Sequence, residues 1–159
     1  MIARVETEVL CATRDTMVAC WGFVRHGLLA VKRKAKGAIV WHPEHLRLAL
    51  EKGFTREPGG AELWLACSSG TPVAFVITTP EYDPFLNLPM SLYVWISYHD
   101  PLVRSDAVPK LEAVIEEVAR ARGFASLRCM TTRKGLLPRL APFGWRQVLV
   151  VLEKPLYEE

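Results

Sequence analysis

One segment of the chain contains groups that could hold phosphate at the start of a helix. The segment is Arg104-Ser105-Asp106-Ala107-Val108-Pro109, and residues 110–123 follow it with helical periodicity. A helix N-terminus offers backbone N–H groups to an anion, and Arg104 and Lys110 would add positive charge. A turn that wraps a pyrophosphate favours glycine, which accepts positive φ and permits close backbone approach. Because Ala107 and Pro109 occupy the two small-residue positions, the sequence predicts a phosphate loop of altered chemistry.

Four side chains elsewhere are candidates for proton transfer. Glu81 and Asp83 follow a predicted strand, where a carboxylate could take the proton of an amine nucleophile. His99 ends the next predicted strand and is a further candidate base, while Tyr98, with Tyr93 as an alternative, could act as an acid. Each also has a simpler interpretation, as a polar loop residue, a structural histidine or a core tyrosine. The sequence leaves both interpretations open.

A basic run lies between two predicted helices. Lys32, Arg33, Lys34 and Lys36 could contact an acidic partner, a nucleic acid or a phosphate group. The run has no interleaved aromatic residues on which bases could stack, so nucleic acid is not the favoured partner. A solvated charge run at the surface is the favoured interpretation.

A pair of histidines opens the second predicted helix. His42 and His45 are three residues apart, with Glu44 between them. Metal sites are built from three or four protein ligands, and the sequence offers no further ligand nearby. We therefore predict no metal site and interpret both histidines as surface or capping groups.

The composition indicates one globular domain. The chain has 159 residues, of which 50% are hydrophobic and 23% are charged, enough for a single core spanning residues 1–159. The net charge of +3 is too small to indicate nucleic-acid binding by itself. The four cysteines form no Cys-x-x-Cys motif, which favours reduced thiols and a cytoplasmic protein. No apolar run approaches the roughly 20 residues of a membrane span, so no membrane association is expected.

Apolar periodicity and turn residues predict an alternation of strands and helices. The expected strands are residues 3–12, 62–67, 72–79, 91–99, 126–132 and 147–153. The expected helices are residues 16–26, 42–52, 109–122 and, shortened or distorted by two prolines, 136–143. Residues 28–40 give no clear pattern, and residues 80–89 are expected to form a loop. The order β-α-α-β-β-β-α-β-α-β predicts a mixed α/β sheet.

The strand predicted at residues 91–99 consists largely of strong β-formers. Strict alternation would place its side chains on two opposite faces of the sheet. One face would carry Leu92, Val94, Ile96 and Tyr98, and the other would carry Tyr93, Trp95, Ser97 and His99.

Four stretches between about Cys11 and Leu156 carry a family resemblance. They are Ala12-Thr13-Arg14-Asp15 at a strand-to-helix turn, Ser69-Gly70-Thr71-Pro72-Val73-Ala74-Phe75 in a hairpin, His99-Asp100-Pro101 through Arg104 ahead of the phosphate loop, and Leu140-Ala141-Pro142-Phe143-Gly144-Trp145 near the end. Their order and spacing resemble the GNAT superfamily, the Gcn5-related N-acetyltransferases. The resemblance implies the GNAT-like mixed α/β fold of acyl-CoA N-acyltransferases.

The resemblance implies that acetyl-CoA is the cofactor. In that family acetyl-CoA lies between the fourth and fifth strands, with its pyrophosphate on the loop before the next helix. The cofactor-binding residues that it implies are Trp95, Ile96, Ser97, Arg104, Ser105, Asp106, Ala107, Val108 and Lys110. A backbone N–H near Trp95 or Ile96 would hold the oxyanion. Leu140 stands where many members have the tyrosine that protonates the leaving thiolate.

Two functions of different classes follow from the resemblance. In the first, the protein is an acetyltransferase, and an amine attacks the thioester directly in a ternary complex. The acceptor amine stays open between a small amine, a protein N-terminus or lysine, and a nucleobase. In the second, the domain has lost catalysis and binds a protein partner or a second copy of itself, as in bacteriophage head, tail or internal virion proteins. The prevalence of enzymes in the family favours the first, and the altered loop together with Leu140 favours the second.

Overall fold

A computed structural model describes residues 6–35, 41–130 and 136–148 of the chain. Its elements are β1 (Thr7–Cys11), α1 (Arg14–Lys34), α2 (Pro43–Phe54), β2 (Glu62–Ser68), β3 (Thr71–Tyr82), β4 (Pro89–His99), α3 (Ala107–Ala121), β5 (Ser126–Cys129), α4 (Leu136–Leu140) and a short 3-10 helix at Ala141–Phe143. This order confirms the predicted alternation as far as the short helix. Most of the strand predicted at residues 147–153 lies outside the described residues.

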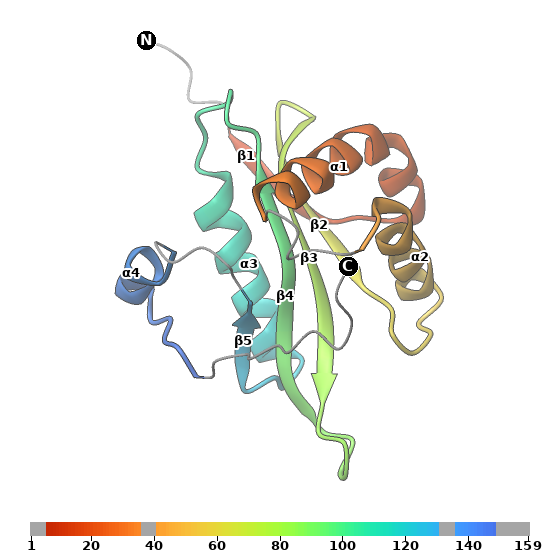
Figure 1. Cartoon of the computed structure of the whole chain (residues 1–159), viewed down its shortest axis with the longest axis vertical. Coiled ribbons are helices and arrows are strands. Elements are labelled where there is room, and N and C mark those ends of the chain that lie inside the picture. The colour runs from red at the N-terminus through yellow and green to blue at the C-terminus, as the bar shows by residue number, and fades with distance from the viewer. Residues whose placement is uncertain (1–5, 36–40, 131–135, 149–159) are drawn as a thin grey trace, which may run out of the picture.

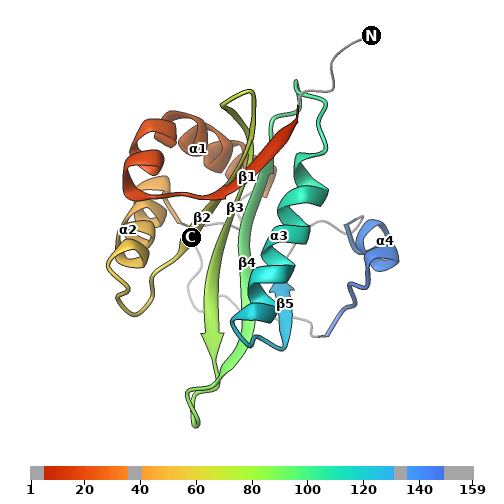
Figure 2. The same ribbon diagram turned by 180° about the vertical axis from the view of Figure 1, so that it is seen from behind.

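The five strands form one mixed sheet in the order β1-β2-β3-β4-β5. β1, β2, β3 and β4 pair with one another in antiparallel fashion, and β5 pairs parallel with β4. Helices α1 and α2 cover one face of the sheet, and α3 crosses the opposite face (Figure 1 and Figure 2). Among the described residues, no helix is both long and apolar enough to cross a membrane.

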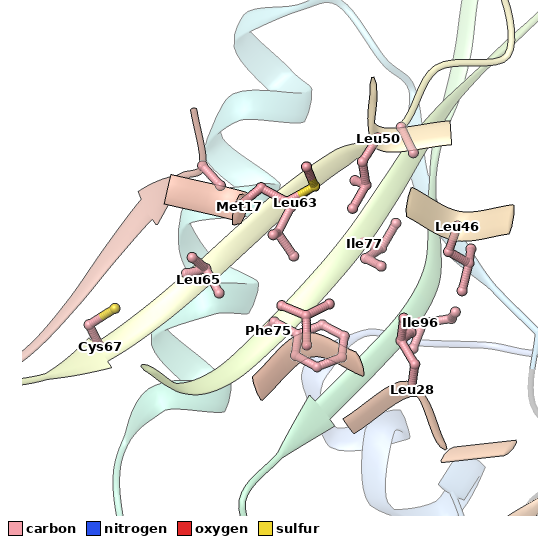
Figure 3. Close-up of a cluster of buried hydrophobic side chains, with 13 residues drawn as sticks. Met17, Leu28, Leu46, Leu50, Leu63, Leu65, Cys67, Phe75, Ile77 and Ile96 are labelled. Atoms are coloured by element: carbon pink, nitrogen blue, oxygen red, sulfur yellow. The ribbon is translucent and has the colours of Figure 1, made fainter. Parts of the chain in front are cut away.

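Two apolar clusters bury the two faces of the sheet. Figure 3 shows the cluster beneath α1 and α2, where Met17, Leu28, Leu46 and Leu50 pack on side chains of β2, β3 and β4. The second cluster lies beneath α3; its helical members are Ala107, Leu111, Ile115 and Ala119, at the spacing of one helix face. Alternation along β2 serves both clusters, because Leu63 and Leu65 face α1 while Trp64 and Ala66 face α3.

Helix α1 is eight residues longer at its C-terminal end than the predicted helix, which stops at His26. Its N-cap is Thr13, whose hydroxyl accepts the backbone N–H of Thr16 at 3.2 Å. Gly27 does not end the helix, because this glycine is buried where α1 crosses the sheet. The basic residues Lys32, Arg33 and Lys34 fill the last turn, where they interact favourably with the helix dipole.

The predicted loop at residues 80–89 is wrong at both ends. β3 continues to Tyr82 and β4 begins at Pro89, so only the tip of the hairpin is irregular. Pro80 pairs with Leu92 inside this hairpin. Proline is tolerated there because β2 ends its pairing at Thr78, which leaves β3 with an edge on that side.

The strict alternation predicted for residues 91–99 is also wrong. The register between β3 and β4 passes from Ile77↔Ile96 to Thr78↔Val94, so Trp95 has no partner on β3. This extra residue is a β-bulge, which changes the face that the following side chains occupy. Leu92 and Val94 therefore pack beneath α3, whereas Ile96 and Tyr98 pack beneath α1.

The contact of Gly27 with the sheet gives a first prediction. A Cβ at this position would lie 2.5 Å from Cε1 of Phe75 and 2.6 Å from Cδ1 of Tyr98. We expect Gly27→Ala to lower the free energy of unfolding by about 1–3 kcal/mol, because the core would be overpacked. Gly22→Ala is the matched control: nothing lies within 4 Å of its added Cβ. It should raise stability by about 0.5–1 kcal/mol, and urea unfolding measures both. Equal effects of the two substitutions would contradict the close packing of α1.

Candidate functional site

The loop before α3 adopts an ordinary helix start rather than a glycine turn. Asp106 is the N-cap residue and Ala107 is the first residue of α3, fully buried beneath the sheet. Outside the glycines, positive φ occurs only at Arg56, Ser69 and Asn87 among the described residues. Ala107 therefore does not need the left-handed conformation for which glycine would be required.

Two backbone N–H groups at the start of α3 donate to no other residue among those described. They belong to Val108 and to Asp106, whose own carboxylate lies close to its N–H. The N–H of Ala107 is donated to Ser105 Oγ at 3.3 Å, and Pro109 has none. Lys110 donates its N–H to the Asp106 carbonyl at 3.2 Å, the first hydrogen bond inside the helix. The loop thus keeps only two donors for an anion, because Ser105 accepts the N–H of Ala107 and Pro109 has no N–H.

The Ser105 hydroxyl also connects the loop to β4. Its Oγ is hydrogen-bonded to His99 Nε2 at 3.1 Å. His99 is the last residue of β4, so this contact holds the strand end against the start of α3. His99 therefore has a positioning contact within the candidate cofactor site.

The side chain of Lys110 points toward β1 rather than toward β4. Its Nζ donates to the Thr7 carbonyl at 3.1 Å and lies 3.3 Å from Asp106 Oδ2. A hydrogen bond from Thr7, followed by the contact with Lys110, holds the pKa of Asp106 below its usual value. Since two strands, β2 and β3, lie between β1 and β4, Lys110 is turned away from the expected cofactor path. Arg104 is exposed and makes no ion pair within the described residues.

One edge of β4 is unpaired where a cofactor is expected. β5 pairs with β4 only from Ser91↔Ser126 to Val94↔Cys129. Within the described ranges, no strand pairs with this edge of β4 from Trp95 to His99. The bulge at Trp95 coincides with the point where the pairing ends. Ile96 and Tyr98 direct their backbone groups to β3, whereas those of Ser97 and His99 face the other edge and have no strand partner among the described residues. Trp95 is 37% exposed, while Ile96 is buried in the core.

Glu81 lies with three other polar side chains on the α1 face of the sheet. Its carboxylate accepts a hydrogen bond from the hydroxyl of Ser91, which is fully buried on β4. Arg128 of β5 lies with its Nη1 3.9 Å from Glu81 Oε2. Tyr93 lies directly opposite Arg128 in the register. Burial, followed by the nearby Cys129 and Glu81, raises the pKa of Tyr93, which therefore keeps its proton at neutral pH.

Asp83 has a structural contact in the β3–β4 hairpin, whose tip extends beyond the other strands in Figure 1. Its Oδ1 accepts the backbone N–H groups of Phe85 at 2.9 Å and Leu86 at 2.7 Å. Asn87, at φ 53°, donates its N–H to the Asp83 carbonyl at 2.9 Å. This Asx turn uses the carboxylate to form the tip of the hairpin.

Tyr98 lies far from Glu81. Its ring packs against Phe23 at 5.8 Å and Phe75 at 5.6 Å between ring centroids, beneath α1. Desolvation and the charge of Asp100 raise the pKa of Tyr98. Phe75, which pairs with Tyr98, is six residues from Glu81 along β3, which corresponds to about 20 Å of strand. The structure therefore does not bring Tyr98 and His99 together with Glu81 and Asp83.

The remaining sequence candidates have local contacts. Lys32 donates to the Trp41 carbonyl at 2.9 Å, Arg33 and Lys34 are exposed, and Lys36 lies outside the described residues. His42 and His45 cap α2: His42 Nδ1 accepts the Glu44 N–H at 3.4 Å, and His45 Nδ1 accepts the His42 N–H at 3.3 Å. No group of three metal-ligating side chains occurs among the residues described.

The sequence interpretation missed Ser91 and Arg128. Ser91 appeared only as the first residue of a predicted strand, and Arg128 only as a polar residue within another. Their contact with Glu81 depends on the register of three strands, which no local pattern reveals. Glu112 was also missed; it accepts the indole N–H of Trp145 at 2.7 Å, a contact between residues 33 apart in the chain that holds the segment after α4 against α3.

Comparison with known proteins identifies the fold. No protein-family model and no curated protein matches the sequence. Among solved structures, a probable acetyltransferase superposes with a TM-score of 0.71 at 15% identity, over 96% of this chain and 99% of that one. A ribosomal-protein-alanine N-acetyltransferase from Brucella melitensis biovar Abortus 2308 superposes with a TM-score of 0.65 at 17% identity, over 96% of this chain and 99% of that one. The aminoglycoside N-acetyltransferase AAC(6')-Iy, in complex with CoA, superposes with a TM-score of 0.66 at 12% identity, over 94% of each chain.

These matches cover almost the whole chain at low sequence identity. The protein therefore has the GNAT acetyltransferase fold, as the four sequence stretches predicted. The CoA in the last complex is bound to that protein.

The contact between Asp106, Thr7 and Lys110 predicts a pH-dependent contribution to stability. The folded-state pKa of Asp106 lies below its ordinary value of about 3.9, so the ionised carboxylate stabilises the folded protein above that pH. This stabilisation is lost as the pH falls through the folded-state pKa. We expect Asp106→Asn to be less stable than the wild type in urea at pH 7, with a difference that shrinks between pH 5 and pH 3. Glu117→Gln, an exposed change on the same helix, should show no such trend. A pH-independent difference for Asp106→Asn would contradict the contact.

Proposed function

We propose that this protein is a GNAT-type N-acetyltransferase that uses acetyl-CoA to acetylate an amine. The observation that carries the proposal is the edge of β4 that pairs with no other described strand; it starts at the Trp95 bulge and ends beside the start of α3. The acetyltransferase fold supports it over nearly the whole chain length.

The residues along this path fit an extended ligand that ends in phosphate groups. The backbone groups of Ser97 and His99 that face away from β3 can pair with the amide groups of a pantetheine arm, as one strand pairs with another. The free N–H groups of Asp106 and Val108, together with Arg104, can receive the pyrophosphate. When bound, acetyl-CoA supplies an acetyl group activated as a thioester. Lys110 is not part of this set, because β1 and Asp106 hold its ammonium group.

Glu81 is the proposed proton acceptor for the acceptor amine. An ammonium group must lose a proton before its nitrogen can attack, and a half-exposed carboxylate on the α1 face can take that proton. Ser91, which pairs with Glu81, is four residues from Trp95 along β4, or about 13 Å of strand. The glutamate side chain and a small acceptor molecule, or a water chain, span this interval.

Tyr93 is the proposed proton donor in place of Tyr98. It lies two residues before the bulge, on the face that carries Glu81, and its raised pKa keeps the hydroxyl protonated. Tyr98 is held among aromatic rings beneath α1. Leu140, at the position of the family's tyrosine, cannot donate a proton, so a proton donor would have to come from another element.

One observation favours a non-catalytic domain as a second candidate. Ser105, Asp106 and Lys110 are hydrogen-bonded or ion-paired within the protein, which reduces the capacity of the loop for phosphate. A domain without cofactor binding would retain the same fold and serve as an interaction module.

Calorimetry with acetyl-CoA distinguishes the two candidates. We expect binding with a micromolar Kd, and we expect Arg104→Ala to weaken it about 10- to 150-fold through loss of a charged hydrogen bond. Arg120→Ala, which removes an exposed arginine elsewhere on α3, is the matched control and should leave the Kd unchanged. No binding at millimolar acetyl-CoA would reject the enzyme and favour the interaction module.

Substitution of the two neighbouring carboxylates tests the proposed base. Glu81→Gln should lower kcat by about 10²- to 10⁴-fold at pH 7, because glutamine cannot accept the proton. Asp83→Asn should retain activity, since its amide oxygen can still accept the two N–H groups of the hairpin tip. Thiol release from acetyl-CoA, measured with a panel of small amines and free amino acids, provides the rates. A Glu81→Gln variant that acetylates at the wild-type rate would exclude this role.

A further inference from the structure

A cluster of mixed charge occupies the α1 face of the sheet where β3, β4 and β5 meet. It consists of Glu81, Ser91, Tyr93 and Arg128, and is called the Glu81–Arg128 cluster below. Glu81 and Ser91 are directly opposite each other in one register, and Tyr93 and Arg128 are opposite each other in the next. Three hydrogen-bonded strands thus hold the four side chains at fixed positions.

The carboxylate of Glu81 is fixed on one side and free on the other. Its Oε2 accepts the hydroxyl of Ser91, a side chain with no exposed surface. Oε1 makes no hydrogen bond or ion pair within the described part of the chain. A carboxylate held in this way can receive an ammonium group without first losing the freedom of its own side chain.

The guanidinium of Arg128 is close to Glu81 but not closely paired with it. Nη1 lies 3.9 Å from Glu81 Oε2, and the two side chains are 39% and 36% exposed. A bidentate pair between arginine and a carboxylate has N···O distances of about 2.7–2.9 Å. Arg128 therefore retains its donors for a second carboxylate, and it has no other acidic partner among the residues described.

We propose that the Glu81–Arg128 cluster binds a free α-amino acid as the acceptor. The inference rests on the proposed function and specifies the substrate class of that same site. An α-amino acid carries an ammonium and a carboxylate on one carbon, so its two charges are as close together as those of Glu81 and Arg128. Glu81 binds the ammonium group, and Arg128 binds the carboxylate through its fork of donors.

Acceptors without a carboxylate fit the cluster less well. A simple amine, a lysine side chain or a peptide N-terminus would place its ammonium on Glu81 and leave Arg128 without a new partner. Each would also bring a positive charge beside the guanidinium without the carboxylate that offsets this charge in an α-amino acid. The position of Arg128 thus selects against them.

Binding measurements without cofactor test this inference. The protein is titrated with the 20 common amino acids, and the amino acid that binds most tightly is compared with its amide and with its decarboxylated amine. We expect the free amino acid to bind at least 10-fold more tightly than either analogue. Arg128→Met should reduce this ratio to about 2 or less, whereas Arg120→Met, which removes the arginine of an exposed pair on α3, should leave it unchanged. Ser91→Ala should weaken binding of all three compounds, because Glu81 loses its fixed orientation.

The possible outcomes separate this inference from the proposed function. The inference is overturned if no amino acid binds at millimolar concentration, if the amide binds as tightly as the free acid, or if the preference persists in Arg128→Met. Any of these results together with micromolar acetyl-CoA binding would leave the acetyltransferase in place with another acceptor. A carboxylate preference that depends on Arg128, in a protein that does not bind acetyl-CoA, would support the amino-acid site and reject the acetyltransferase.

Discussion

The extra residue at Trp95 in β4 is the constraint on which the rest of the structure depends. Before it, Leu92 and Val94 pack beneath α3; after it, Ile96 and Tyr98 pack beneath α1. One strand therefore contributes to both apolar clusters on different faces along its length. The pairing of β4 with β5 stops one residue before the bulge, at Val94. The same irregularity thus joins the two cores and leaves the strand edge that the proposed cofactor would use.

Around this edge, polar groups are held by contacts from neighbouring elements. His99 and Ser105 connect the end of β4 to the start of α3, while Lys110 and Asp106 connect the same turn to Thr7 of β1. On the other side of the bulge, Ser91 of β4 holds the carboxylate of Glu81 on β3, which also lies near Arg128 of β5. The proposed cofactor path and the proposed acceptor site are consequently two separate groups of residues along one strand. Because β4 carries both, the residues between Ser91 and His99 determine how donor and acceptor would meet.

Sequence patterns predicted the elements better than their contacts. Turn residues and apolar periodicity identified β2, α3 and the short helix at Pro138, because these signals are local. The bulge was not predictable. Residues 91–98 are strong β-formers at nearly every position, so no alternation of polar and apolar residues marks the point at which the side chains change face. The direction of the Lys110 side chain could not be predicted from the sequence for another reason, because its acceptor is the carbonyl of Thr7, 103 residues earlier in the chain. The Asx turn at Asp83, by contrast, is a local feature that its residue type could have indicated.

Amide hydrogen exchange along β4 tests the central claim most directly. If this edge of β4 is the cofactor site, the amides of Ser97 and His99, which point away from β3, exchange quickly in the free protein and are protected on addition of acetyl-CoA, as are those of Asp106 and Val108. The amides of Leu63, Leu65 and Ile77 in the paired core strands should not change. Protection that appears only elsewhere in the chain, or no change at millimolar acetyl-CoA, would contradict the account.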